Sequence, residues 1–86
     1  MPTISVFYGI LIQMFWDEHA PPHFHALYAE YEAVFDIKTL EIIKGNMPRR
    51  AKILVLEWAM QHRQQLLENW ELCSQKKTPR KIRPLS

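Results

Sequence analysis

The sequence predicts an α+β fold, in which an antiparallel β-meander of four to five strands packs against a long C-terminal helix or helix pair. Up to Gly45, short β-branched and aromatic runs alternate with turn residues, a pattern typical of strands. Residues 48–73 have no glycine or proline after the first position, and their apolar residues recur every three or four positions, as in a helix. Every connection between the expected strands is too short for a parallel crossover. Strands followed by helix are typical of the α+β class.

The expected strands are short and closely spaced. They are residues 2–8, 10–16, 23–28, 31–37 and 40–44. In the third strand, the side-chain period of two puts His23 and His25 on one face. Phe24 and Ala26 then lie on the other face, so two histidines share one side of a strand whose other side is apolar.

The helical region is expected to begin at Asn46 or Met47 as its cap, with Pro48 in the first turn. A single helix of about 26 residues would be about 39 Å long, which is long for so small a chain. A break within residues 61–65 is therefore the alternative. Cys73 lies near the C-terminal end of this region, where the helix dipole does not favour a thiolate, so we expect it to be unreactive.

A chain of 86 residues is expected to form one domain, here residues 1–75, followed by a basic tail, residues 76–86. The five cations of the tail are Lys76, Lys77, Arg80, Lys81 and Arg83. We expect them to contact an anionic partner such as a nucleic-acid backbone, to fold back on the acidic body of the chain, or to serve solubility alone. A single cysteine, together with the lack of a long apolar run or a secretory signal, predicts a cytoplasmic protein with no membrane span.

Three of the four histidines, His19, His23 and His25, lie around a proline pair. Side chains two positions apart on a strand emerge on the same side about 7 Å apart, which suits two ligands of one metal ion. His19 can fold over as a third ligand, and either Asp17 or Glu18 can supply a carboxylate. Such a set would suit zinc or another divalent first-row metal. Proton transfer, phosphate contact and a purely structural role are the alternatives.

A second candidate site lies at the start of the expected helix, where Arg49, Arg50 and Lys52 are clustered. The positive end of the helix dipole is unfavourable for cations, but free amides and Arg side chains together form an anion site. The expected ligand is a phosphate or the carboxylate of a partner. The alternative is that these long side chains reach the acids of the sheet.

Several short motifs are spread over nearly the whole chain. They are Met1–Ser5, Phe7–Ile10, the loop ending Pro21-Pro22-His23-Phe24-His25-Ala26, Asp36-Ile37, Pro48–Ala51, Glu57–Ala59, His62-Arg63, Leu67–Trp70 and Ile82 with Pro84-Leu85. In this set the chain resembles a small bacterial family known as domain of unknown function 4160. The resemblance implies a small α+β domain encoded in two-gene modules, in the manner of toxin–antitoxin pairs. It implies no catalytic residues, and Leu40 departs from the glycine that is common at the family's hairpin.

We therefore expect a component of a bacterial type II toxin–antitoxin module, the toxin rather than the antitoxin, with a cognate small antitoxin-like protein as its partner. If the chain is an enzyme, it would be ribonuclease-like, with His19, His23 and His25 in acid–base roles. Arg49 and Arg50 would then hold the phosphate of the RNA. The alternatives are an antitoxin-like module that binds protein or nucleic acid without catalysis, and a small metal-binding protein. A thin core and three tryptophans also suggest a homo-oligomer.

Overall fold

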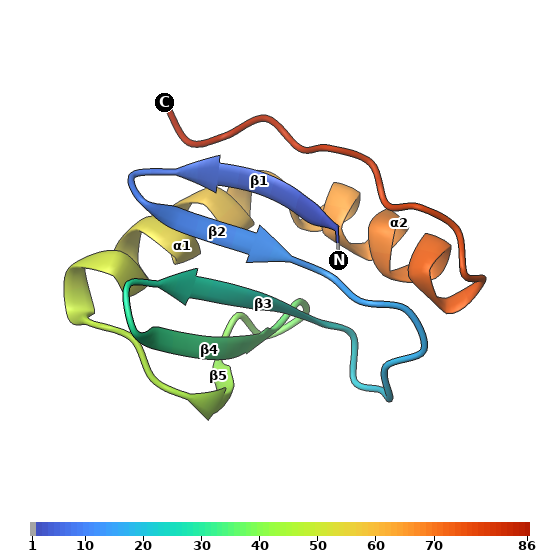
Figure 1. The fold of residues 1–86 in the computed structure, drawn as a ribbon, viewed down its shortest axis with the longest axis horizontal. Helices are drawn as coiled ribbons and strands as arrows, with labels where there is room; N and C mark the ends of the chain where they lie inside the picture. The colour runs from blue at the N-terminus through green and yellow to red at the C-terminus, as the bar shows by residue number, and fades with distance from the viewer. Residues whose placement is uncertain (1) are drawn as a thin grey trace.

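The computed structural model describes residues 2–86 and contains five strands followed by two helices. The strands are β1 (Thr3–Phe7), β2 (Ile10–Gln13), β3 (His23–Tyr28), β4 (Tyr31–Asp36) and β5 (Ile42–Gly45), and the helices are α1 (Arg49–Gln61) and α2 (Arg63–Ser74). All strand pairs are antiparallel, and the sheet order is β1-β2-β3-β4-β5 (Figure 1). The predicted α+β meander is therefore confirmed. Neither helix has the length and hydrophobicity needed to span a bilayer.

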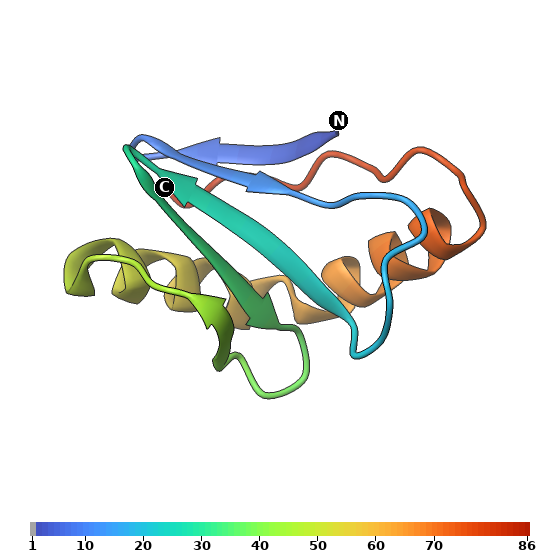
Figure 2. The ribbon, with the colours of Figure 1, turned by 60° about the horizontal axis from the view of Figure 1, so that its bottom comes forward.

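The two helices lie across one face of the sheet, and side-chain alternation decides what that face contributes (Figure 2). In β3, Phe24 and Ala26 are fully buried, whereas His23 and His25 are only partly buried. Phe24 lies parallel to Phe35 of β4, with ring centroids 5.3 Å apart. Burial of the apolar side of β3 thus directs both histidines to the opposite side, as the sequence predicted.

Trp58 of α1 lies at the centre of the core. It is fully buried, and its ring centroid lies 5.3 Å from that of Phe7 and 5.9 Å from that of Phe24. Its indole N–H donates a hydrogen bond to the carbonyl oxygen of Arg83 over 2.9 Å. Truncating a buried tryptophan to alanine lowers the free energy of unfolding by about 3–5 kcal/mol. The Trp58 side chain therefore contributes strongly to holding helix, sheet and C-terminal segment together.

The helical region forms a helix pair, which is one of the two arrangements that the sequence allowed. α1 has 13 residues and α2 has 12, and His62, with φ −127°, ends the first and precedes the second. A straight helix of 26 residues would be about 39 Å long, but the longest extent of the whole molecule is 33 Å. The break keeps both helices over the sheet, so that Ala59 of α1 and Leu66 of α2 are both fully buried.

Two strand boundaries differ from the expectation by two residues or more, and the others agree to within one residue. β2 ends at Gln13 rather than at Trp16. Met14 still donates its amide to the carbonyl of Pro2, but the residues after Gln13 have no strand partners. β5 begins two residues later than expected, because Leu40 has a φ of 61°, which is incompatible with a strand. A positive φ also gives the physical reason why glycine suits this hairpin position.

The expected cap of α1 is also corrected. Neither Asn46 nor Met47 caps the helix, because Pro48 occupies the N-cap position, and it makes no side-chain hydrogen bond to the helix. Proline fixes φ near the value that leads into a helix, so the start is set by backbone geometry rather than by a polar side chain.

Residues 76–86, here called the C-terminal strap, run back along β1 (Figure 1). The amide of Ile82 donates to the carbonyl of Ile4 over 2.8 Å, and the Ile82 side chain is buried. The buried side chain of Asn69 in α2 donates to the Arg80 carbonyl and accepts from the Arg80 amide, both over 2.8 Å. The segment predicted as a tail is therefore attached to the body through its backbone.

The hairpin between β3 and β4 offers a test of backbone strain. Ala29 is exposed and has a φ of 52°, a region that glycine adopts freely. We expect Ala29→Gly to raise the free energy of unfolding by about 0.5–1 kcal/mol, because relief of this strain outweighs the entropy that glycine adds to the unfolded chain. Denaturant unfolding followed by circular dichroism measures the change.

Glu30→Gly is the matched control, because Glu30 is the neighbouring residue of the same turn and has no positive φ. This substitution adds unfolded-state entropy without relieving strain, so it should lower the free energy of unfolding by about 0.5 kcal/mol. Equal effects of the two substitutions would contradict the assignment of strain to Ala29.

Candidate functional site

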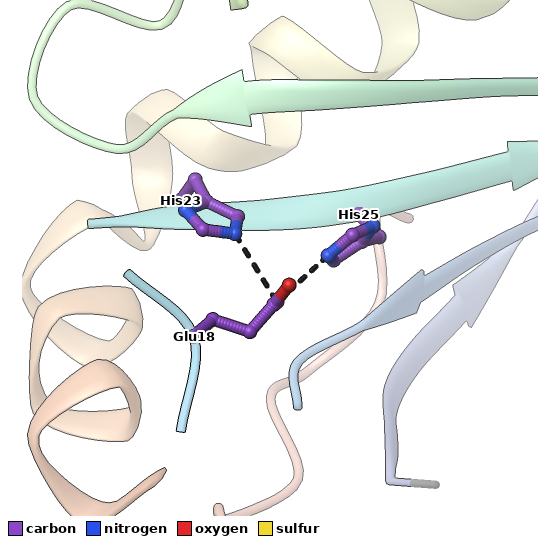
Figure 3. A group of neighbouring side chains, drawn as sticks. All are labelled: Glu18, His23 and His25. Atoms are coloured by element: carbon purple, nitrogen blue, oxygen red, sulfur yellow. Dashed lines mark hydrogen bonds and ion pairs between the residues drawn. The ribbon is translucent and has the colours of Figure 1, made fainter. Parts of the chain in front are cut away.

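Glu18, His23 and His25 bring three potential metal-ligand atoms together (Figure 3). Oε1 of Glu18 lies 2.8 Å from Nε2 of His25 and 3.1 Å from Nε2 of His23. All three ligand atoms lie within 4.8 Å of one another. The glutamate side chain is 28% exposed, and those of His23 and His25 are 11% and 12% exposed. One carboxylate oxygen therefore faces two ring nitrogens in a partly dry site.

The loop between β2 and β3 carries Glu18 to the two histidines. It is fixed by the chain that follows α2: the indole N–H of Trp16 donates to the carbonyl of Lys77 over 3.1 Å. Next to it, Asp17 forms an ion pair with Lys76 over 3.5 Å. These partners are separated by about sixty residues, so the position of Glu18 depends on the completed fold.

The second nitrogen of each ring is also held. Nδ1 of His23 lies 2.8 Å from the carbonyl oxygen of Pro21. Nδ1 of His25 lies 3.3 Å from Oε2 of Glu32. Carbonyl and carboxylate oxygens only accept hydrogen bonds, so each Nδ1 carries a hydrogen. In the neutral form of each ring, Nε2 then presents a lone pair toward Glu18.

Two chemical states satisfy these contacts. In the first, Glu18, His23 and His25 would hold a metal ion between them, and each Nδ1–H would make the outer hydrogen bond that metal-bound histidines usually make. In the second, both rings carry a second proton and donate it to the carboxylate. The arrangement can therefore serve metal binding or proton transfer.

A cavity of about 480 Å³ opens beside these groups. Its lining is Glu18, His19, Ala20, Pro21, His23, His25, Glu32, Val34, Ile43, Lys44 and Gly45. The volume lies within the range of small-molecule sites, about 300–1,000 Å³. Histidine, acidic, apolar and cationic side chains thus surround one space.

His19, the third histidine of the predicted site, is exposed and lines this cavity. The described residues whose ligand atoms come together are instead Glu18, His23 and His25. Of the two carboxylates that the sequence offered, Glu18 faces the histidines, whereas Asp17 pairs with Lys76. The loop therefore places His19 beside the cavity, whereas the adjacent residue Glu18 faces His23 and His25.

Sequence analysis did not single out Glu32, although a signal for it was present. The two-residue turn pairs Tyr28 with Tyr31, and the register then pairs Leu27 with Glu32. Glu32 is therefore diagonal to His25 on the same face of the sheet. A hairpin register derived from the turn would have placed this carboxylate beside the histidine.

Two aromatic side chains fix the orientation of the imidazoles. The ring of Phe15 meets that of His25 edge-on with centroids 4.6 Å apart, and Trp70 of α2 lies 4.9 Å from His23. Aromatic packing of this kind restricts ring rotation, which prepares both histidines for a single geometry. Neither contact was evident from the sequence.

The predicted anion site does not join the histidines. Arg49 and Arg50 begin α1, and Lys52 follows in its first turn, at the end of the molecule opposite the loop between β2 and β3 (Figures 1 and 2). Arg50 lines a separate cavity of about 440 Å³ together with Tyr8 and Tyr28. The structure therefore separates the phosphate-holding role predicted for these arginines from the chemistry predicted for His23 and His25.

The segment predicted as a nucleic-acid-binding tail forms the C-terminal strap, and all five of its cationic side chains are exposed. These are Lys76, Lys77, Arg80, Lys81 and Arg83. Lys76 pairs with Asp17, and Nζ of Lys81 donates to the carbonyl of Thr3 over 2.8 Å. Two of the five are thus engaged by the body, while the backbone of Arg80 is held by Asn69.

Cys73 of α2 is buried and is not one of the clustered ligands. Burial raises the pKa of its thiol above the ordinary value, and the negative charge of Glu18 raises this pKa further. The thiolate is the nucleophilic form of cysteine, so a thiol kept protonated reacts slowly. This agrees with the unreactive cysteine expected from the sequence.

We expect iodoacetamide at about pH 8 to modify native Cys73 at least tenfold more slowly than the unfolded chain, because the thiolate is both scarce and shielded. Since the folded state keeps the thiol protonated, the free energy of unfolding should also fall as the pH rises above the range in which an unfolded thiol ionises. Mass spectrometry over time measures the alkylation rate. Equal rates in the native and denatured chain would contradict the burial of this residue.

A family model described as "Domain of unknown function (DUF4160)" matches residues 9–71, which is more than half of the chain. The matched range includes the loop, all three clustered residues and Glu32. No curated protein and no solved structure matches the chain. The chain belongs to the family of domain of unknown function DUF4160.

Proposed function

We propose that this protein binds a divalent first-row metal ion, zinc in the first instance, through Glu18, His23 and His25. The observation that carries the proposal is the convergence of two Nε2 atoms on one carboxylate oxygen, with each Nδ1 already hydrogen-bonded outward. The carbonyl of Pro21 and the carboxylate of Glu32 supply the outer contacts that orient metal-bound imidazoles.

The geometry requires only small side-chain movements to accept an ion. Zinc binds imidazole nitrogen and carboxylate oxygen at about 2.0–2.2 Å, so the ligand atoms of a tetrahedral site lie about 3.3–3.5 Å apart. The two nitrogen–oxygen distances here are 2.8 and 3.1 Å. An ion that enters would therefore push the ligand atoms slightly apart and remove the contact between lone pairs.

Three protein ligands leave a coordination position for water, and the adjacent cavity can hold a substrate. A bound divalent ion lowers the pKa of such a water toward neutrality and makes it a nucleophile. The class of reaction that this site supports is therefore metal-assisted hydrolysis. Metal-assisted hydrolysis thus extends the alternative function raised by the sequence, that of a small metal-binding protein.

The biological role that we infer is that of the toxin component of a bacterial toxin–antitoxin module, acting on RNA in the cytoplasm with a cognate small antitoxin-like protein as its partner. The resemblance described above supports the module, and the exposed cations of the C-terminal strap support contact with RNA backbone. Exposed apolar side chains at Val6, Tyr8 and Leu11 provide a surface for the partner or for a homo-oligomer. If the site holds no metal, His23 and His25 remain candidates for ribonuclease-like acid–base work.

We expect untagged protein to bind about one equivalent of zinc, and the double variant His23→Ala/His25→Ala to bind less than about a tenth of an equivalent. Glu32→Gln should weaken zinc binding about 10–100-fold, because it removes the charge that orients His25. Metal analysis after gel filtration measures the stoichiometry, and competition with a chromophoric chelator measures the affinity.

Two matched controls keep this test specific. His62 lies outside the cluster and contacts Gln65, so His62→Ala should leave zinc binding unchanged. Glu30→Gln removes an exposed acid two positions from Glu32 and should also have no effect. Retention of zinc by the double histidine variant would overturn the proposed site.

The toxin role predicts that induction of this chain alone arrests bacterial growth, and that the Glu18→Gln and His25→Ala variants do not. Loss of either ligand should remove the metal and with it the hydrolytic activity. Culture density after induction measures the effect, with His62→Ala and equal expression levels as controls. Normal growth with the natural chain would contradict the toxin role while leaving the metal site open to direct measurement.

A further inference from the structure

The cavity beside the proposed metal centre is also lined by a positively charged side chain, that of Lys44. Among the described residues that line it, Lys44 is the only lysine or arginine. Lys44 is exposed, and no carboxylate among residues 2–86 forms an ion pair with it within 4.0 Å. Glu32, on the same wall, is instead engaged by Nδ1 of His25. The cavity therefore has a positive group available to a ligand.

The sheet register places this lysine in line with the metal centre. His25 of β3 pairs with Val34 of β4, and Val34 pairs with Lys44 of β5. Directly opposed residues of antiparallel strands project from the same face. The imidazole, an apolar side chain and the ammonium thus form one row across three strands.

A β-bulge in β5 brings Ile43 to the cavity beside Lys44. The β4–β5 register shifts between Val34 and Phe35, so that Ile43 has no partner of its own. Bulges redirect side chains, and here both Ile43 and Lys44 line the cavity. Gly45 ends β5 with a φ of 78°, and a Cβ there would collide with the carbonyl oxygen of Glu32, so the position requires glycine. The backbone of β5 is thus shaped to present an apolar and a cationic side chain together.

We propose that Lys44 binds the phosphoryl group of the ligand whose oxygen takes the open position on the metal, which makes phosphoesters the substrate class of this site. The inference rests on the metal-binding function proposed above. A phosphoryl group has several oxygens that point in different directions, so one can bind the ion while another accepts from the ammonium. Val34, Ile43 and Pro21 then provide an apolar wall for the organic part of the ester.

The test uses full-length protein loaded with Co²⁺, whose visible absorption reports changes in coordination, with free ion removed by gel filtration. We expect inorganic phosphate to change the spectrum of the natural chain saturably, and Lys44→Met to raise the apparent Kd for phosphate about tenfold, because a charge-assisted hydrogen bond is lost. Lys38→Met, which removes an exposed lysine that is not among the residues lining the cavity, is the matched control and should leave the Kd unchanged.

The outcomes separate the two proposals. Cobalt binding without a spectral response to phosphate, or with equal affinities in the two lysine variants, overturns the role of Lys44 and leaves the metal site standing. A response to acetate that matches that to phosphate in both size and dependence on Lys44 assigns the site to carboxylates and overturns the phosphoester class. Failure of the natural chain to bind cobalt overturns the metal-binding function and this inference with it.

Discussion

Packing of Trp58 against Phe24 determines both the core and the site. Phe24 lies between His23 and His25 in β3, and its full burial beneath the sheet fixes the side from which both histidines project. The indole N–H of Trp58 also holds the Arg83 carbonyl, which ties the C-terminal strap to the same centre. A change that loosened this contact would therefore disturb the register of β3, the strap and the ligand geometry together.

The acidic member of the site is held in a different way. Glu18 lies on a loop that no ladder supports, and it is placed by contacts of Trp16 and Asp17 with the chain beyond α2. Partial burial of a carboxylate is unfavourable unless partners compensate it, so Glu18 requires either a metal ion between its oxygen and the two ring nitrogens or protons on those nitrogens. The site thus joins a rigid strand to a loop whose position depends on the last part of the chain.

The charges of the molecule are divided between separate surfaces. The proposed metal centre and Lys44 share one cavity, whereas Arg49 and Arg50 lie at the far end of α1 and the remaining cations follow the C-terminal strap. A ligand in the cavity would meet the metal ion and one lysine, and an extended anionic partner would meet the strap. Recognition of a small anionic group and of a long polymer would therefore use different residues.

The sequence alone determined the order of strands and helices, the antiparallel pairing and the shared face of His23 and His25, because these follow from local periodicity and short connections. It offered Glu18 as a ligand only as one of two acids. The choice of Glu18, the recruitment of Glu32 and the separation of the arginines from the histidines were decided by tertiary structure. These features depend on loop anchoring, strand register and helix direction, which bring together residues far apart in the chain, and no local pattern encodes such distances.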